Sequence, residues 1–130
     1  MRFSAIGRIV FALTVAVGTA SIAYAQSISD CQALLVALRV KAQSVPLTGQ
    51  NADRERAGLV NKLNEAAIKL NQAKFCDSLV KLNDFEVKLQ QLASAGKITF
   101  EDAEVLSRDA ATASQCVQNV ATSAGVACGG

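Results

Sequence analysis

Four cysteines, at positions 31, 76, 116 and 128, carry most of the reactive chemistry in this 130-residue chain. Cys76 stands beside Phe75 in the stretch KFCDSLVKLNDF, and such a thiol can be a nucleophile, a metal ligand or half of a disulfide. A nucleophilic thiol usually needs a neighbouring base, but the chain contains no histidine. Zinc sites built from four cysteines use close pairs such as C-x2-C, and no two cysteines here are so spaced. The pattern therefore predicts structural disulfides.

Four cysteines allow three pairings. If the last two helices form a hairpin about Gly96, the numbers of two facing residues sum to roughly twice 96. Cys76 and Cys116 meet this condition, so they should lie level with each other across the hairpin. This geometry predicts a Cys76–Cys116 bridge and, by default, a Cys31–Cys128 bridge between the first helix and the end of the chain. The alternative of Cys31 with Cys76 and Cys116 with Cys128 stays open, although it needs a sharp turn after the last helix.

The first 25 residues, MRFSAIGRIVFALTVAVGTASIAYA, have the organisation of a secretory signal peptide. Arg2 and Arg8 precede an apolar run, and an Ala-Tyr-Ala triplet closes the segment. We expect cleavage between Ala25 and Gln26, a secreted or periplasmic protein, and no membrane span once the segment is removed. A membrane anchor is the alternative, but the uncharged stretch is barely long enough for one.

The charge balance without this segment argues against nucleic acid as a partner. Two of the 13 Lys and Arg residues lie in it, which leaves 11 against 11 Asp and Glu. A neutral chain with interspersed charges has no basic stripe with which to neutralise phosphates. The absence of histidine also removes the usual ligands for zinc and haem. We expect no cofactor, no metal ligand and no catalytic residue.

Several polar groups resemble sites, and each has a structural interpretation that we favour. Asn51 to Glu55, NADRE, looks like the opening of a calcium loop, but Arg56 stands where that loop has Gly, so a helix start with acids in its first turn fits better. Five carboxylates could suggest acid–base chemistry, but they fit solvated helix faces: Asp84, Glu86, Glu101, Asp102 and Glu104. Phe75, Phe85 and Phe100 are expected in the core, with a small ligand cavity among them as the alternative.

Apolar residues recur at helical spacing in four consecutive segments. The first runs from Ile28 to Val45 and ends at Pro46, and the second begins near Asn51 or Asp53. The third runs from about Phe75 to the glycine at position 96, and the fourth opens at Thr99, an expected N-cap. Short connections make neighbouring helices antiparallel. The sequence thus predicts an all-α, up-down-up-down four-helix bundle tied by disulfides.

We expect residues 26–130 to form this single helical domain. The alternative architecture is a three-helix core over residues 51–122 with a loosely packed N-terminal helix.

Residues 56–117 resemble the FIMAH domain, a small helical module of bacterial exported and surface proteins. The resemblance is carried by Gly58-Leu59 with Lys62-Leu63, by Lys74-Phe75, by Lys81-Leu82 with Phe85, and by Gly96-Lys97-Ile98 followed by Glu101-Asp102-Ala103. Some members of that family carry a cysteine after the corresponding Phe and another late in the last helix, which agrees with pairing Cys76 with Cys116. The resemblance implies a helical fold, a bacterial exported setting and an accessory role without catalytic residues. It does not account for the N-terminal segment with Cys31.

Two functions are consistent with these observations. The first is a non-enzymatic interaction module that docks on an unidentified protein or cell-envelope component through a helix face. The alternative is a carrier of a small apolar ligand held between helices.

Overall fold

The computed structural model describes residues 26–129, which form four α-helices joined by short loops. They are α3 (Ile28–Ser44), α4 (Ala52–Asn71), α5 (Phe75–Ser94) and α6 (Phe100–Ser123). The predicted signal peptide, residues 1–25, and its cleavage position lie outside the described residues, apart from Gln26. Among residues 26–129, no helix is long and apolar enough to cross a membrane.

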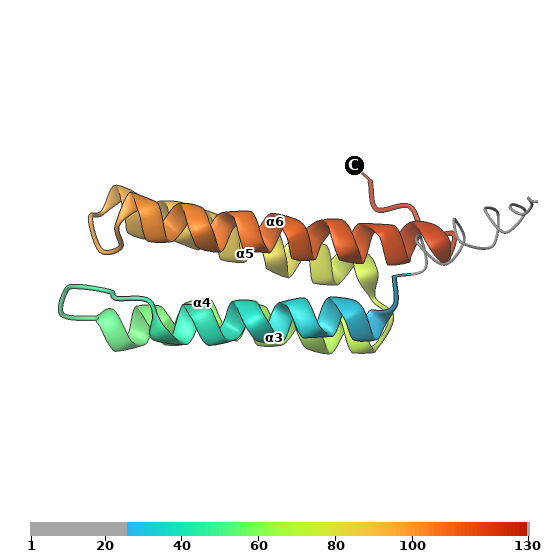
Figure 1. The fold of residues 1–130 in the computed structure, drawn as a ribbon, viewed down its shortest axis with the longest axis horizontal. Helices are drawn as coiled ribbons and strands as arrows, with labels where there is room; N and C mark the ends of the chain where they lie inside the picture. The colour runs from blue at the N-terminus through green and yellow to red at the C-terminus, as the bar shows by residue number, and fades with distance from the viewer. Residues whose placement is uncertain (1–25, 130) are drawn as a thin grey trace, which may run out of the picture.

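The helices run alternately up and down, as predicted (Figure 1). α4 packs against α3 and α5, and α6 packs against α3 and α5, so each helix has two neighbours around the bundle. One end, at the left of Figure 1, carries the α3–α4 and α5–α6 loops, and we call it the loop end. The opposite end carries the α4–α5 loop, the start of α3 and the C-terminal tail, and we call it the cysteine end.

Helix boundaries follow local capping chemistry. Ser27 caps α3 through a capping box, accepting from the Asp30 amide at 3.1 Å while the Asp30 carboxylate accepts from the Ser27 amide at 3.0 Å. Thr99 caps α6 as expected, accepting from the Asp102 amide at 3.1 Å. Gly96 ends α5 in the left-handed region, with φ of 72°. A residue without a Cβ adopts that conformation at little cost.

All four helices contribute to one hydrophobic core. α3 buries Cys31, Leu35, Leu38 and Ala42 in it. The first helix is therefore an integral wall of the bundle, and the alternative of a three-helix core with a loose N-terminal helix does not hold.

The predicted disulfide pairing is wrong. The bridges are Cys31–Cys116 and Cys76–Cys128, with Cα–Cα distances of 5.6 and 5.2 Å. Cys76 and Cys116 do belong to the same end of the bundle, but Cys116 is buried in the core and Cys76 is only partly buried. Because Cys76 follows the core residue Phe75 directly, it lies about 100° round α5 from it. Cys31, by contrast, lies on the core stripe of α3 and meets Cys116 there.

The C-terminal tail supplies the second bridge. After α6 the chain turns at Gly125, with φ of 77°, and residues 126–129 return along α5. Cys128 then reaches the partly exposed Cys76, whose Sγ also lies 3.9 Å from the Ala127 carbonyl oxygen.

The loop end is held by hydrogen bonds and ion pairs. The Arg56 guanidinium donates to the carbonyl oxygens of Val45 at 2.6 Å and Ala42 at 3.2 Å, which completes the C-terminus of α3. The Glu55 carboxylate lies 2.8 Å from Lys88 Nζ and 3.3 Å from Lys97 Nζ. These two hydrogen-bonded lysines, Lys88 foremost, lower the pKa of Glu55 from its ordinary value of 4.5.

Candidate functional site

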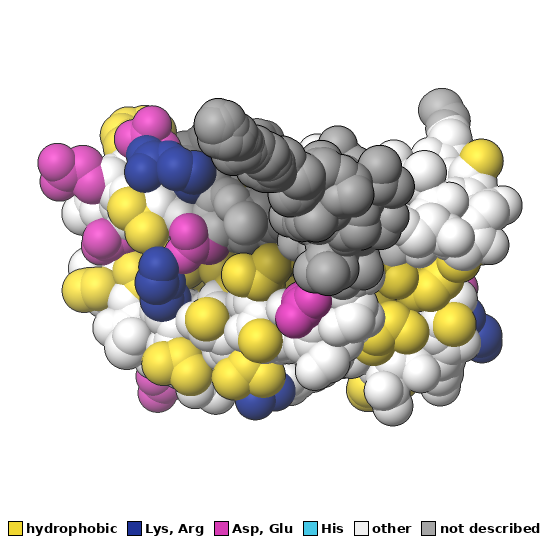
Figure 2. All heavy atoms as spheres, turned by 45° about the vertical axis from the view of Figure 1, so that its right-hand side comes forward, with side chains coloured by type: hydrophobic (Ala, Val, Ile, Leu, Met, Phe, Trp, Pro, Cys, Tyr) yellow, Lys and Arg dark blue, Asp and Glu magenta, His cyan; other side chains and the backbone are white. Residues whose placement is uncertain are grey.

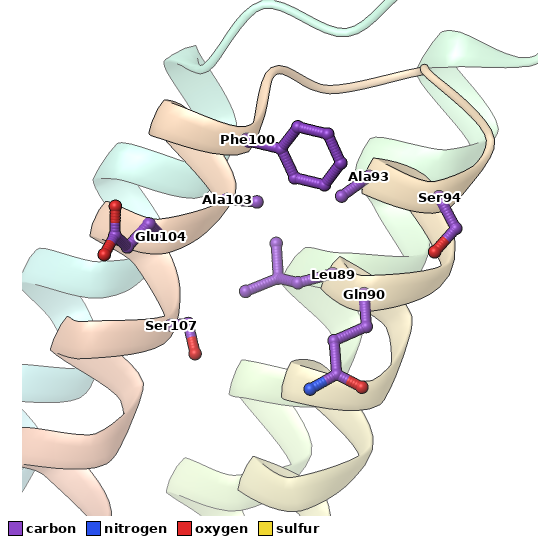
Figure 3. A pocket seen from close by; sticks show the side chains of 8 residues that line it. All are labelled: Leu89, Gln90, Ala93, Ser94, Phe100, Ala103, Glu104 and Ser107. Atoms are coloured by element: carbon purple, nitrogen blue, oxygen red, sulfur yellow. The ribbon is translucent and has the colours of Figure 1, made fainter.

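The residue that stands out at the loop end is Phe100, whose side chain is 77% exposed. It begins α6 and lies over a groove between α5 and α6 with a volume of about 260 Å³. Figure 3 shows the Phe100 ring reaching from α6 toward Ala93 of α5, with Leu89 deeper between the helices. The groove lining is Leu89, Gln90, Ala93, Ser94, Phe100, Ala103, Glu104 and Ser107.

The prediction that Phe100 belongs to the core is wrong, and Ile98 explains why. Ile98 is buried and contributes to the core at the loop end. The first buried residues of α6 are Ala103, Leu106 and Ala110, which form a stripe along one side of the helix. Phe100 lies to the α5 side of this stripe. The first turn of α6 therefore presents its aromatic ring to the groove and to solvent.

The three phenylalanines predicted in the core do not share one cavity. Phe75 and Phe85 are buried, as predicted. Phe75 begins α5 at the cysteine end, whereas Phe100 begins α6 at the loop end. A helix of 20 residues is about 30 Å long, which separates the two rings by most of the bundle's length. Any ligand in contact with Phe100 would lie in the α5–α6 groove and away from Phe75.

The rim of the groove is polar and carries negative charge. Gln90 and Ser94 come from α5, and Glu104 and Ser107 come from α6 (Figure 3). Exposed Glu101 stands next to Phe100 in the first turn of α6. An apolar floor with one acidic residue, Glu104, on its border is suited to a large apolar side chain that has a basic neighbour.

The other polar groups singled out in the sequence lie at helix starts and on helix faces, and two of the five carboxylates have side-chain partners. Asn51 occupies the N-cap position of α4 with Asp53 and Glu55 in its first turn, as the helix-start interpretation expects. Glu86 accepts a hydrogen bond from the Ser107 hydroxyl at 3.1 Å, and Glu104 lies 3.6 Å from Arg108. Within residues 26–129, no group of three or more His, Cys, Asp or Glu side chains is arranged to hold a metal ion.

All four cysteines are joined in disulfides, as predicted, although with different partners.

The groove itself was missed by the sequence analysis. Its signal was the position of Phe100 directly after the N-cap Thr99, because a residue at the first turn of a helix can face away from the core stripe that follows.

Comparison with known proteins finds no matching family model, no matching curated protein and no matching solved structure.

Proposed function

We propose that the chain is a non-enzymatic interaction module that docks on a partner protein through the Phe100 groove. The observation that carries the proposal is the exposed aromatic ring over an apolar groove between two helices. Phenylalanine is among the aromatic residues that are enriched at the core of protein interfaces. The partner segment would present one large apolar side chain with a neighbouring Lys or Arg, to match Glu104 on the border of the groove.

A carrier of a small apolar ligand is the second candidate for the same groove, since its floor is apolar. Two observations favour docking over carriage. The volume of about 260 Å³ lies just below the range of about 300 to 1,000 Å³ typical of small-molecule sites. Phe100 also remains mostly exposed, so it forms an open edge and does not enclose a ligand.

The exported, bacterial setting and the FIMAH likeness remain parts of this proposal. Two disulfides support an oxidising compartment outside the cytosol. The FIMAH likeness rests on the residue pattern of segment 56–117 and is consistent with an all-helical accessory module.

Site-specific photo-crosslinking in the producing cell tests the docking proposal. A benzoylphenylalanine in place of Phe100 should give one defined protein adduct, because the ring would contact the partner directly. The matched control is the same replacement of Val87, which is 43% exposed on α5 and does not line this groove. No adduct at position 100 above the level at position 87 would refute docking through this groove.

A binding measurement then gives the energetic role of the ring. For a peptide that spans the crosslinked segment, Phe100→Ala should raise the Kd by about thirtyfold, as expected for an aromatic anchor. Val87→Ala should change the Kd by less than about twofold. Native mass spectrometry of the same protein decides the alternative, because a stoichiometric small molecule lost in Phe100→Ala would establish a carrier.

A further inference from the structure

A second surface, far from the Phe100 groove, lies on α3. Its exposed residues Ala33, Val36, Ala37 and Val40 form what we call the α3 outer face. Val36 is 46% exposed and Val40 is 56% exposed, and no charged residue interrupts the four. A helix whose buried and solvent faces are both apolar is typical of one that is covered on both sides. Figure 2 shows hydrophobic side chains grouped on the lower part of the visible face, where α3 lies.

The charges of α3 lie beside this face and not on it. Arg39 points toward α4, where its guanidinium donates to Asn64 Oδ1 at 3.0 Å. Lys41 points toward α6 and pairs with Asp109. Asp30, at the start of the helix, precedes Lys41 by 11 residues, or about three turns. Asp30 and Lys41 therefore border the same side of the α3 outer face, one near each end.

We propose that the α3 outer face binds the same face of a second copy of this chain, with the two α3 helices antiparallel. A two-fold axis near Val36 would place Val36 against Val36 of the second copy. Ala33 and Ala37 would pack against the adjacent turns of the second α3, and their small side chains let the helices approach closely. The same axis sets Asp30 level with Lys41 of the second copy, and Lys41 level with its Asp30. Both pairs are of opposite charge, so the borders complement each other when the face pairs with itself.

A parallel arrangement lacks this complementarity. It would set Asp30 and Lys41 of one copy on the opposite side of the seam from those of the other copy, so no charge would meet an opposite charge across the contact. The contact is also modest in size, because α3 has 17 residues and is about 25 Å long. A single pair of such helices falls toward the small end of specific interfaces, so the dimer should be weak and concentration-dependent. The Phe100 groove lies between α5 and α6 and stays accessible in this dimer.

Sedimentation velocity of the purified, oxidised protein from micromolar to millimolar concentration tests the proposal. We expect a shift from monomer to dimer across this range. Val40→Lys should raise the dimer Kd at least about tenfold, because it buries an unpaired charge at the contact. Ile68→Lys is the matched control, since Ile68 is 56% exposed on α4, and it should leave the Kd within about twofold. A monomer at all concentrations, or equal effects of the two variants, would overturn the proposal.

Charge reversal tests the antiparallel register. Asp30→Lys alone and Lys41→Glu alone should each raise the Kd about tenfold, since each places like charges together twice in the dimer. An equimolar mixture of the two variants should associate more tightly than either variant alone, because every pair across the mixed dimer is again opposite in charge. Recovery should be partial, since Lys41→Glu also places a carboxylate beside Asp109. Circular dichroism checks that both variants are folded. If Asp30→Lys unfolds through loss of its helix cap, Val40→Lys still tests the dimer. Single variants that leave the Kd unchanged, or a mixture no tighter than the single variants, would refute the antiparallel arrangement.

Discussion

The two ends of the bundle are held together by different chemistry. At the cysteine end, Cys31–Cys116 ties α3 to α6, and Cys76–Cys128 ties α5 to the tail. At the loop end, described contacts between helices are hydrogen bonds and ion pairs, among them those of Arg56 and Glu55. The Phe100 groove opens at the loop end. The proposed docking site is thus at the end of the bundle opposite the two disulfides.

Removal of the buried Cys31–Cys116 bridge should change the stability of the bundle more than any other substitution considered. Cys31→Ala with Cys116→Ala should lower the free energy of unfolding by about 3 to 5 kcal/mol, because it releases an 85-residue connection and leaves space in the core. Urea unfolding followed by circular dichroism measures the loss. A loss below about 1 kcal/mol would show that the cysteine end does not depend on its covalent tie.

The surface bridge should matter less. By restricting the unfolded chain alone, the two bridges should stabilise the fold by amounts that differ by only about 0.4 kcal/mol, since their sequence separations are 85 and 52. Cys76→Ala with Cys128→Ala, however, also frees a mostly exposed tail in the folded state and leaves no void in the core. We expect a loss of about 1 to 2 kcal/mol under the same urea conditions. Equal losses for the two double variants would mean that burial does not distinguish the bridges.

Disulfide pairing shows where sequence reasoning stopped. The hairpin about Gly96 correctly placed Cys76 and Cys116 at the same end of the bundle. A disulfide also requires that the two side chains point toward each other, and the apolar spacing of each helix indicates that direction. Cys31 follows the stripe that continues to Leu35 and Leu38, whereas Cys76 stands one position off its own stripe. Gly125 did signal that the tail could turn, but it did not indicate which cysteine Cys128 would reach.

The helices themselves were predicted closely because their apolar spacing and caps agree. Ser27 was missed among the caps, although Ser27 and Asp30 have the same spacing as Thr99 and Asp102 and so carry the same capping-box signal. Phe100 was misplaced because three apolar residues, Ile98, Phe100 and Ala103, compete for the same end of the core. In the structure Ile98 and Ala103 are buried and Phe100 is exposed, and spacing alone does not reveal that choice.

Helix C-termini offer a matched pair of substitutions at the two ends. Gly96 and Ala73 both follow a helix with positive φ, 72° and 60°. The same two bonds close each turn: the residue's own amide donates to the carbonyl oxygen three residues back, and the next residue's amide donates to the carbonyl oxygen five residues back from itself. Ala73→Gly at the cysteine end should raise the free energy of unfolding by about 0.5 to 1 kcal/mol, because it relieves the left-handed Cβ strain. Gly96→Ala at the loop end should lower it by about 1 kcal/mol. Changes of the same sign in thermal or urea unfolding would contradict this view of the two turns.

The smallest expected effect concerns pH and the loop end. Since the lysines lower the pKa of Glu55 in the folded state, the unfolded chain binds the proton more readily, so the stabilisation is present above pH 4.5 and is lost as the pH falls. Glu55→Gln should therefore flatten the dependence of unfolding free energy on pH between about pH 5 and about pH 3. If Glu55→Gln keeps the wild-type slope, the Glu55 ion pairs do not hold the loop end, and Arg56 with the packed Ile98 must do so alone.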